Sequence, residues 1–282
     1  MSTPPSLRHC CTAELIGTFL LIFFGCGSVH VAVLLGGLQG LWQVGIVWGL
    51  SIMLAIYTIG QFSGAHINPA ITLGFSFWNE FPRRRVVPYI LSQFAGAMLA
   101  ATSLLVLFGP SLQEYEQQHG IRRGSEESVL TAMCYGEYYM NPGGYSFTDG
   151  RVDRAQLQRH LQQLPTGTAF FAELLGTAIL GFVVARTTSA ENSEVPTRLA
   201  PVFIGLTVTA LICVIAPLTQ ACFNPARDFG PRIVAAAAGW GAAAIPGPNG
   251  MGSVLVYILA PVLGSVLGIG LARMLTPPVA SR

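Results

Sequence analysis

The sequence predicts an all-α membrane protein with six spanning helices and two shorter re-entrant helices, arranged as an inverted repeat. Three observations lead to this prediction. Apolar runs of about twenty residues, the length that a helix needs to cross a bilayer, occur six times. Two segments, 63–70 and 222–227, join an extended stretch to a short helix through the same Asn-Pro-Ala motif. A further pattern, Ala-Glu-Leu-x-Gly-Thr, occurs once near the beginning of each half of the chain.

The composition agrees with a membrane protein and excludes other classes. Of the 282 residues, 52% are hydrophobic and only 10% are charged, against about 25% charged residues in soluble domains. The net charge of +2 is too small to predict binding to nucleic acid. The six cysteines form no Cys-x-x-Cys pair, so we expect no disulfide framework, metal site or cofactor. Cys10 and Cys11 lie beside the first apolar run, where palmitoylation is an alternative to a plain juxtamembrane position.

The apolar runs divide the chain into two halves of similar design. They cover residues 12–35, 41–60, 86–108, 167–186, 199–218 and 253–274. A short helix follows the second and the fifth run, so each half consists of two spans, a half-helix and a third span. The first run is too long for a cleaved signal peptide, and no cleavage site follows it. We expect a single channel domain over residues 1–282, with halves at about 11–108 and 166–275 joined by a long outer loop, 109–165.

The two short helices are predicted to begin at the Asn-Pro-Ala motifs. Asn is a preferred N-cap, and Pro is favoured at the first helical position. The stretches that follow, 71–78 and 228–238, have room for only two to three turns, roughly half of the hydrocarbon thickness. Irregular backbone at this depth is tolerated where it lines a cavity, so the pair predicts a pore. Its motif residues are Asn68, Pro69, Ala70, Asn224, Pro225 and Ala226.

The order of the repeated patterns predicts an inverted repeat. The sequence AELIGT at 13–18 returns as AELLGT at 172–177, and the second Asn-Pro-Ala follows the first at nearly the same spacing. Because three spans per half is an odd number, the second half must insert with the opposite orientation. Inverted repeats with broken helices have their functional site near the bilayer midplane, where the halves meet.

Arginine positions predict the orientation of the chain. Cytoplasmic loops carry an excess of basic residues, and the short loops 36–40 and 239–252 carry no charge at all. We therefore expect both termini in the cytoplasm and the long loop 109–165 outside, with a short amphipathic surface helix at 152–164. The basic residues that define the cytoplasmic side are Arg8, Arg83, Arg84, Arg85, Arg186 and Arg198.

Together these motifs resemble the aquaporins, or major intrinsic proteins, over residues 11–275. The segments WQV at 42–44, RRGSEES at 122–128 and NPARDFGPR at 224–232 are similar to the glycerol facilitator branch, for which Asp228 is a marker. The resemblance implies an aquaporin-like right-handed bundle and a homotetramer with one pore per subunit, surrounded by lipid in a plasma or inner membrane. It also implies passive passage of glycerol and water, with urea and neutral metalloid acids as further candidates, and exclusion of ions and protons.

The resemblance also assigns an outer constriction by position. Its four residues are Trp48, Ile212, Ala221 and Arg227. Glycerol facilitators usually have a small residue in place of Ile212 and an aromatic residue in place of Ala221, so this set looks more like that of the plant nodulin-26-like channels. A lipid-facing position is the alternative for Trp48, and a buried ion pair is the alternative for Arg227, since arginine inside a bilayer is normally paired or lines water.

Two glutamates in apolar runs are expected to support the re-entrant segments. Glu14 and Glu173 occupy equivalent places in the repeats, so we predict that both accept hydrogen bonds from re-entrant N–H groups. The alternative for Glu14 is an exposed position at the membrane edge. The predicted contacts would turn a set of backbone carbonyls toward the lumen, namely those of Gly64, Ala65, His66, Gln220, Ala221 and Cys222.

The motif asparagines are expected to line the pore as well as cap their helices. Asn68 and Asn224 would each present a side-chain NH₂ donor to a passing oxygen. Two helix N-termini that meet at mid-membrane would form a positive barrier to cations and protons.

Three rival functions remain open at this point. A water-selective aquaporin is the nearest alternative, although such members carry His on the fifth span, where this chain has none. A secondary transporter would also use inverted repeats, but the spans lack the acidic residues expected for ion coupling. We expect no enzyme activity and no catalytic residue, because His66 and Cys222 have no visible acid–base partner.

Overall fold

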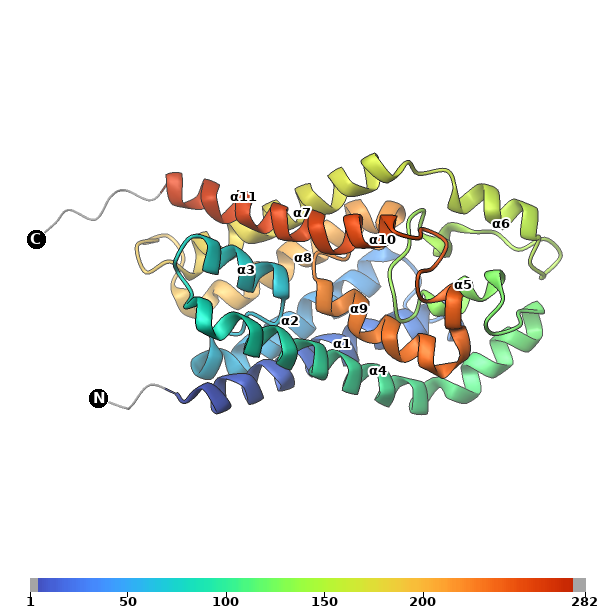
Figure 1. The fold of residues 1–282 in the computed structure, drawn as a ribbon, viewed down its shortest axis with the longest axis horizontal. Helices are drawn as coiled ribbons and strands as arrows, with labels where there is room; N and C mark the ends of the chain where they lie inside the picture. The colour runs from blue at the N-terminus through green and yellow to red at the C-terminus, as the bar shows by residue number, and fades with distance from the viewer. Residues whose placement is uncertain (1–4, 276–282) are drawn as a thin grey trace, which may run out of the picture.

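The computed structural model describes residues 5–275, which form an elongated bundle of helices without a β-strand in this part of the chain (Figure 1). Six helical segments are long and apolar enough to span a membrane, which confirms the predicted fold class. They are α1 (Leu7–Leu35), α2 (Leu41–Ser63), α4 (Arg83–His119), α7 (Thr166–Thr188), Thr197–Thr219 with α8 (Ala200–Thr219), and Gly252–Met274 with α10 (Gly252–Val254) and α11 (Ala260–Met274). The two half-helices are α3 (Pro69–Phe77) and α9 (Pro225–Ala235).

The helix contacts follow the inverted repeat. Helix α1 packs against α2 and α4, and in the second half α7 packs against α8 and α11. Helices α2 and α8 pack against each other between the halves. Each half-helix packs chiefly against the third span of the opposite half, α3 against α11 and α9 against α4. The two halves are therefore interlocked.

Glycines allow the third span of each half to approach the first. A Cβ added at Gly96 in α4 would lie 2.2 Å from the carbonyl oxygen of Leu15 in α1. At the equivalent place in the other half, a Cβ on Gly264 in α11 would lie 2.3 Å from the carbonyl oxygen of Leu174 in α7. Backbone rather than a movable side chain fills the space in both cases, so these helix pairs depend on glycine.

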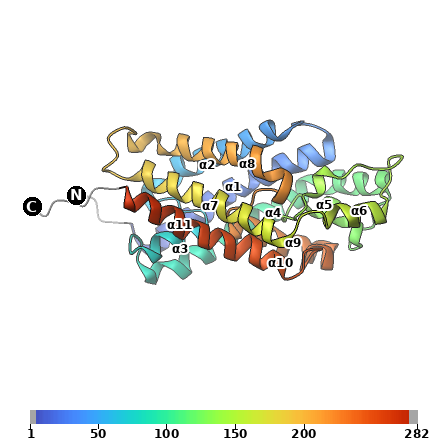
Figure 2. The same cartoon turned by 90° about the horizontal axis from the view of Figure 1, so that it is seen from above.

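The outer loop contains more helix than the sequence predicts. The third span was expected to end at residue 108, but α4 continues to His119 and ends where Gly120 adopts a left-handed φ of 67°. The apolar run ends before the helix does, because residues 111–119 are polar yet rich in good helix formers. The loop also contains α5 (Val129–Ala132) and α6 (Arg154–Leu161), of which α6 lies within the predicted surface helix. Figure 2 shows α5 and α6 at the end of the bundle opposite to the start of α1 and the end of α11.

The close glycine contacts generate a prediction about stability. We expect Gly96→Ala to destabilise the protein although Ala favours a helix by up to about 1 kcal/mol, because separating two backbones typically costs about 1–3 kcal/mol. Gly264→Ala should behave in the same way. Gly109→Ala is the matched control in α4, since no atom lies within 4 Å of its added Cβ. The measurement is the temperature at which detergent-solubilised protein loses its monodisperse peak, and equal temperatures for Gly96→Ala and Gly109→Ala would contradict the prediction.

Candidate pore and outer constriction

The half-helices α3 and α9 meet end to end through their capping asparagines. The Oδ1 of Asn68 accepts a hydrogen bond from the N–H of Ala70 at 2.8 Å, and the Oδ1 of Asn224 accepts one from the N–H of Ala226 at 3.0 Å. Each side-chain NH₂ also donates across the interface, from Asn68 to the Phe223 carbonyl and from Asn224 to the Ile67 carbonyl, both at 2.9 Å. One N–H of each asparagine is thus used to join the halves, which leaves the second for other acceptors.

A buried glutamate holds the backbone that precedes the first half-helix. The carboxylate of Glu14 accepts hydrogen bonds from the N–H groups of His66 at 2.9 Å and Ile67 at 2.7 Å. It also accepts from the Ser63 hydroxyl at 2.7 Å and from the Gln93 amide at 2.8 Å. Because Glu14 is fully buried, its alternative placement at the exposed membrane edge is wrong.

Glu173 makes the equivalent contacts in the second half. Its carboxylate accepts from the N–H groups of Cys222 at 3.0 Å and Phe223 at 2.8 Å, and from the Thr219 hydroxyl at 2.5 Å. Three donors therefore converge on one buried carboxylate. With no water in the hydrocarbon region, backbone N–H groups at this depth need such acceptors.

Both re-entrant segments contain non-glycine residues with a left-handed backbone conformation, that is, with a positive φ. Ala65 and Ile67 have φ values of 50° and 44°, and their repeat equivalents Ala221 and Phe223 have values of 61° and 54°. Non-glycine residues rarely adopt a left-handed conformation, and they persist in it only where their surroundings require it. In both halves, the hydrogen bonds that the glutamate accepts from the segment hold the backbone in this conformation.

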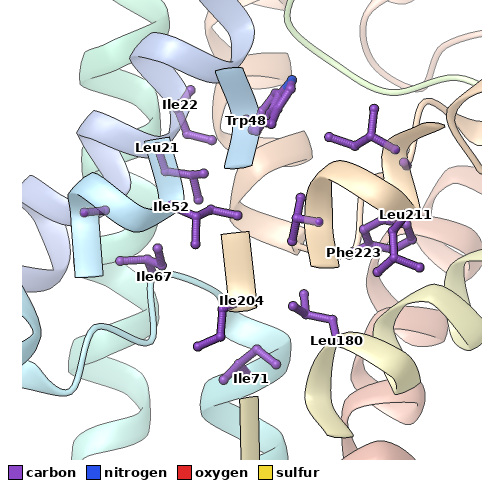
Figure 3. Close-up of a cluster of buried hydrophobic side chains, with 14 of the residues drawn as sticks. Leu21, Ile22, Trp48, Ile52, Ile67, Ile71, Leu180, Ile204, Leu211 and Phe223 are labelled. Carbon is purple, nitrogen blue, oxygen red and sulfur yellow. The ribbon is translucent and has the colours of Figure 1, made fainter. Parts of the chain in front are cut away.

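A narrow cavity of about 90 Å³ runs past the junction of the half-helices. The polar side chains of its wall come mainly from the re-entrant segments and the start of α9, namely His66, Asn68, Cys222, Asn224 and Arg227, beside Gly64, Ala65, Ile67, Ala221 and Phe223. The other part is apolar and comes mainly from the spanning helices, with Leu21, Trp48, Ile52, Leu180, Ile204 and Ile212 among its residues. In Figure 3 the side chains of Trp48, Ile52, Leu180 and Ile204 point into the space between the helices.

The predicted constriction residues lie between this cavity and a wider outer one. Trp48, Ile212 and Arg227 line both cavities, and the outer cavity has a volume of about 450 Å³. Ala221 lines the inner cavity beside them. The guanidinium of Arg227 lies 4.4 Å from the centre of the Trp48 ring, a cation–π contact. Because Trp48 is buried and faces the cavity, the lipid-facing alternative is wrong.

Gln220 differs from the other residues of the predicted carbonyl line. It lines the outer cavity and is absent from the wall of the inner one. Its side chain is used by the outer loop, since it accepts from the Tyr138 N–H at 2.9 Å and donates to the Met133 carbonyl at 3.2 Å. Gln220 is the left-handed C-cap of α8, as Gly64 is of α2.

Arg227 both lines the cavity and takes part in a buried ion pair. Its guanidinium donates to the Tyr135 carbonyl at 3.1 Å and contacts the Sγ of Cys26 at 3.4 Å. Its other partner is the carboxylate of Glu137, which sequence reasoning missed. Arg227 therefore combines the two predicted alternatives, since it lines the cavity and also forms a buried ion pair. The only signal for Glu137 was a single acidic residue among the tyrosines at 135–139.

Asp228 and Arg232 join α9 to the same part of the outer loop. Arg232 donates to the Asp228 carboxylate at 2.8 Å and to the Ala244 carbonyl at 2.8 Å. Asp228 also accepts the N–H of Glu137 at 2.6 Å, and the Glu137 carbonyl accepts from Arg232. Asp228 therefore has a structural contact that accounts for its presence beside the arginine.

The outer loop forms part of the wall of the outer cavity. Residues from both its helical and its irregular parts contribute, namely Tyr115, Leu130, Met133, Asn141, Pro142, Gly143, Tyr145 and Phe147. Asn141 attaches this wall to α8, because its backbone N–H donates to the Leu218 carbonyl at 3.0 Å and its side chain to the Ala216 carbonyl at 2.7 Å. The loop is therefore a structured vestibule above the constriction.

Six spans with two half-helices that meet at a lined cavity define an integral membrane protein of the channel class. Residues 1–272 match the major intrinsic protein family. The chain is 38% identical to a glycerol uptake facilitator protein of Pseudomonas aeruginosa over 96% of this chain and 90% of that one. The corresponding Escherichia coli protein is 37% identical over 95% and 88%, and a propanediol uptake facilitator of Citrobacter freundii is 36% identical over 96% and 93%.

A solved structure shares the same fold. The aquaglyceroporin from Plasmodium falciparum superposes with a TM-score of 0.76 at 22% identity, covering 96% of this chain and 97% of its own. The chain belongs to the major intrinsic protein family. Because this is a family of membrane channels, the prediction of a channel rather than an enzyme is confirmed.

The contacts of Glu173 generate a prediction about its replacement. Glu173→Gln keeps one acceptor but brings an NH₂ toward the N–H donors of the re-entrant segment, so we expect a loss of about 1–3 kcal/mol in stability. The glycerol-to-water permeability ratio of the protein that folds should change little. The change in stability is measured as the temperature at which the detergent-solubilised protein loses its monodisperse peak. Glu114→Gln, on the exposed end of α4, is the control. A normal thermal profile together with an altered permeability ratio would count against a supporting role.

Proposed function

We propose that this protein is a passive channel for glycerol and other small uncharged solutes, water included, and that it excludes ions and protons. The observation that carries the proposal is the two-sided wall of the narrow cavity. Its polar part comes from the re-entrant segments, and its apolar part comes mainly from α1, α2, α7 and α8. A polyol has hydroxyls and C–H groups on different sides, so it matches such a wall, whereas water needs no apolar face.

The names of the relatives support the same solute class. The Pseudomonas aeruginosa and Escherichia coli relatives are described as glycerol uptake facilitators, and the Citrobacter freundii relative as a propanediol uptake facilitator. Both solutes are small and uncharged and carry hydroxyl groups on a carbon chain. Urea and neutral metalloid acids remain further candidates for this channel.

The constriction residues take different parts in this proposal. Trp48 and Ile212 offer apolar faces to C–H groups, and Arg227 offers an N–H donor to a hydroxyl. Ala221 leaves the space that admits a solute larger than water. Asn68 and Asn224 offer donors at the junction of the half-helices, and the carbonyls of Gly64, Ala65, His66, Ala221 and Cys222 offer acceptors beside it.

A secondary transporter is the alternative from another class. Such a protein needs acidic groups that are available for ion coupling at the membrane centre. The buried carboxylates beside this cavity are engaged, since Glu14 and Glu173 accept re-entrant N–H groups while Glu137 and Asp228 pair with arginines. This engagement favours passive conduction.

The proposal includes an assembly and an orientation. We place the chain as a homotetramer in the lipid of a plasma or inner membrane, with both termini in the cytoplasm. In Figures 1 and 2 the start of α1 and the end of α11 lie at the same end of the bundle, which supports termini on one side. The excess of arginine in the loops on that side supports the cytoplasm as the side that holds both termini.

A flux measurement tests the function. Vesicles that contain the protein should re-swell in a glycerol gradient faster than empty vesicles, and the rate should not depend on a proton or sodium gradient. Water permeability is measured by shrinkage in sucrose. A glycerol rate that collapses when the ion gradient is removed would identify a transporter, and fast water flux without glycerol flux would identify a water-selective channel.

The space beside Ala221 generates a prediction about selectivity. Ala221→Phe adds a ring to a gap already lined by Trp48 and Ile212, and overpacking of about 1–3 kcal/mol corresponds to a roughly five- to 150-fold slowing of glycerol. Water should lose much less. Adding Ile212→Gly should restore glycerol flux. Val214→Phe is the control, because its side chain on α8 is 73% exposed and outside the cavity. An unchanged glycerol-to-water ratio in Ala221→Phe would mean that selectivity resides elsewhere.

A further inference from the structure

The outer loop places a carboxylate directly on the arginine of the constriction. Glu137 is fully buried, and its carboxylate forms an ion pair with the guanidinium of Arg227, whose side chain is only 4% exposed. The carboxylate oxygens of Glu137 accept no hydrogen bond from any other group in residues 5–275. Arg227 is therefore the only ion-pair partner of this carboxylate in the described part of the chain.

The backbone of Glu137 is held in place by α9. Its N–H donates to Asp228 at 2.6 Å, and its carbonyl accepts from Arg232. Asp228 and Arg232 form their own ion pair at 2.8 Å, one turn apart on the helix that begins at Asn224. The backbone that carries this carboxylate is thus hydrogen-bonded to α9, although it belongs to a loop far from Arg227 in the sequence.

The charge of this pair matters because of what surrounds it. The N-termini of α3 and α9 place positive ends at the cavity, and these repel cations and protons. The same positive potential attracts anions, and an unopposed guanidinium would increase that attraction in a site of low dielectric constant. A carboxylate at the guanidinium cancels the added charge while leaving N–H groups of Arg227 as donors.

We propose that Glu137 is a positioning residue that makes the constriction electrically neutral, so that Arg227 donates hydrogen bonds to uncharged solutes without admitting small anions. The inference rests on the proposed function, because it specifies how the proposed pore rejects one class of ion. Burial raises the pKa of the Glu137 carboxyl above its usual value, and the guanidinium of Arg227 offsets only part of that shift. The carboxylate nevertheless lies in direct ion-pair contact with the guanidinium, and this contact is favourable when both groups are ionised.

The experiment measures chloride influx into vesicles that contain a chloride-quenched dye, with the membrane potential clamped by potassium and valinomycin. Glycerol and water permeability are measured on the same vesicles, and all rates are divided by the amount of protein. Wild type should conduct glycerol and admit no chloride above empty vesicles. Glu137→Gln should admit chloride about tenfold or more faster than the background leak of empty vesicles, because one uncompensated charge acts strongly at a site of low dielectric constant.

Glu127→Gln is the matched control. Glu127 belongs to the same loop, is also buried and pairs with Arg154 at 2.6 Å, but it lines neither the narrow cavity nor the outer one. Burial alone would raise the pKa of Glu127, but hydrogen bonds from its own backbone and from Arg154 lower it below its usual value, so this variant also removes one loop charge. It should remain impermeable to chloride.

The double variant Glu137→Gln with Arg227→Val tests whether the leak depends on the arginine. Chloride influx should return toward the wild-type level, because no unopposed charge remains. Equal leaks in the single and double variants, or a chloride-tight Glu137→Gln channel that still conducts glycerol, would overturn the inference. If Glu137→Gln yields no folded protein, Glu137→Asp keeps the charge and should stay chloride-tight, so a leak in that variant would also overturn it. Wild type that conducts no glycerol would refute the proposed function instead.

Discussion

The structure depends on one constraint, which is that peptide N–H groups brought to the middle of a membrane must find acceptors. Two re-entrant segments expose such groups, and two buried glutamates accept them, Glu14 in the first half and Glu173 in the second. Because these N–H groups are directed to one side, the segments adopt the alternating left-handed backbone seen at Ala65 and Ala221. The polar part of the cavity wall, the capped half-helices and their meeting point all follow from this arrangement.

The groups around the cavity are polar but carry no unpaired formal charge at the constriction. The asparagine amides, the peptide groups of the re-entrant segments and the donors of Arg227 carry hydrogen-bonding capacity, while the formal charges beside the constriction occur in pairs. A bare charge would hold an oppositely charged ion at a site of low dielectric constant, whereas dipoles offer weaker and more numerous contacts. Such a wall suits rapid passage of an uncharged solute better than its retention.

The sequence was informative wherever the repeat or the hydropathy marks a residue. The six spans and both half-helices follow from apolar length and from Asn-Pro-Ala, and the two halves supply each other's equivalent positions. Two features without a repeat equivalent were missed. The ion pair of Glu137 joins a loop to Arg227 across a long stretch of chain, and a single acidic residue among tyrosines does not indicate such a partner. The extension of α4 to His119 was missed because polar residues end the apolar run without ending the helix.

The exchange of half-helices between the halves has a consequence for how the chain is made. Helix α3 is synthesised early, yet it packs on α11, where Trp78 at its end donates to the Val266 carbonyl at 2.9 Å. Helix α9 packs on α4, which already exists when α9 emerges. The first half-helix therefore has no partner for its main contact until α11 leaves the ribosome. During biosynthesis, the polar re-entrant segment of the first half lacks this contact while the intervening helices are made, and the cavity reaches its final form only after α11 has been synthesised.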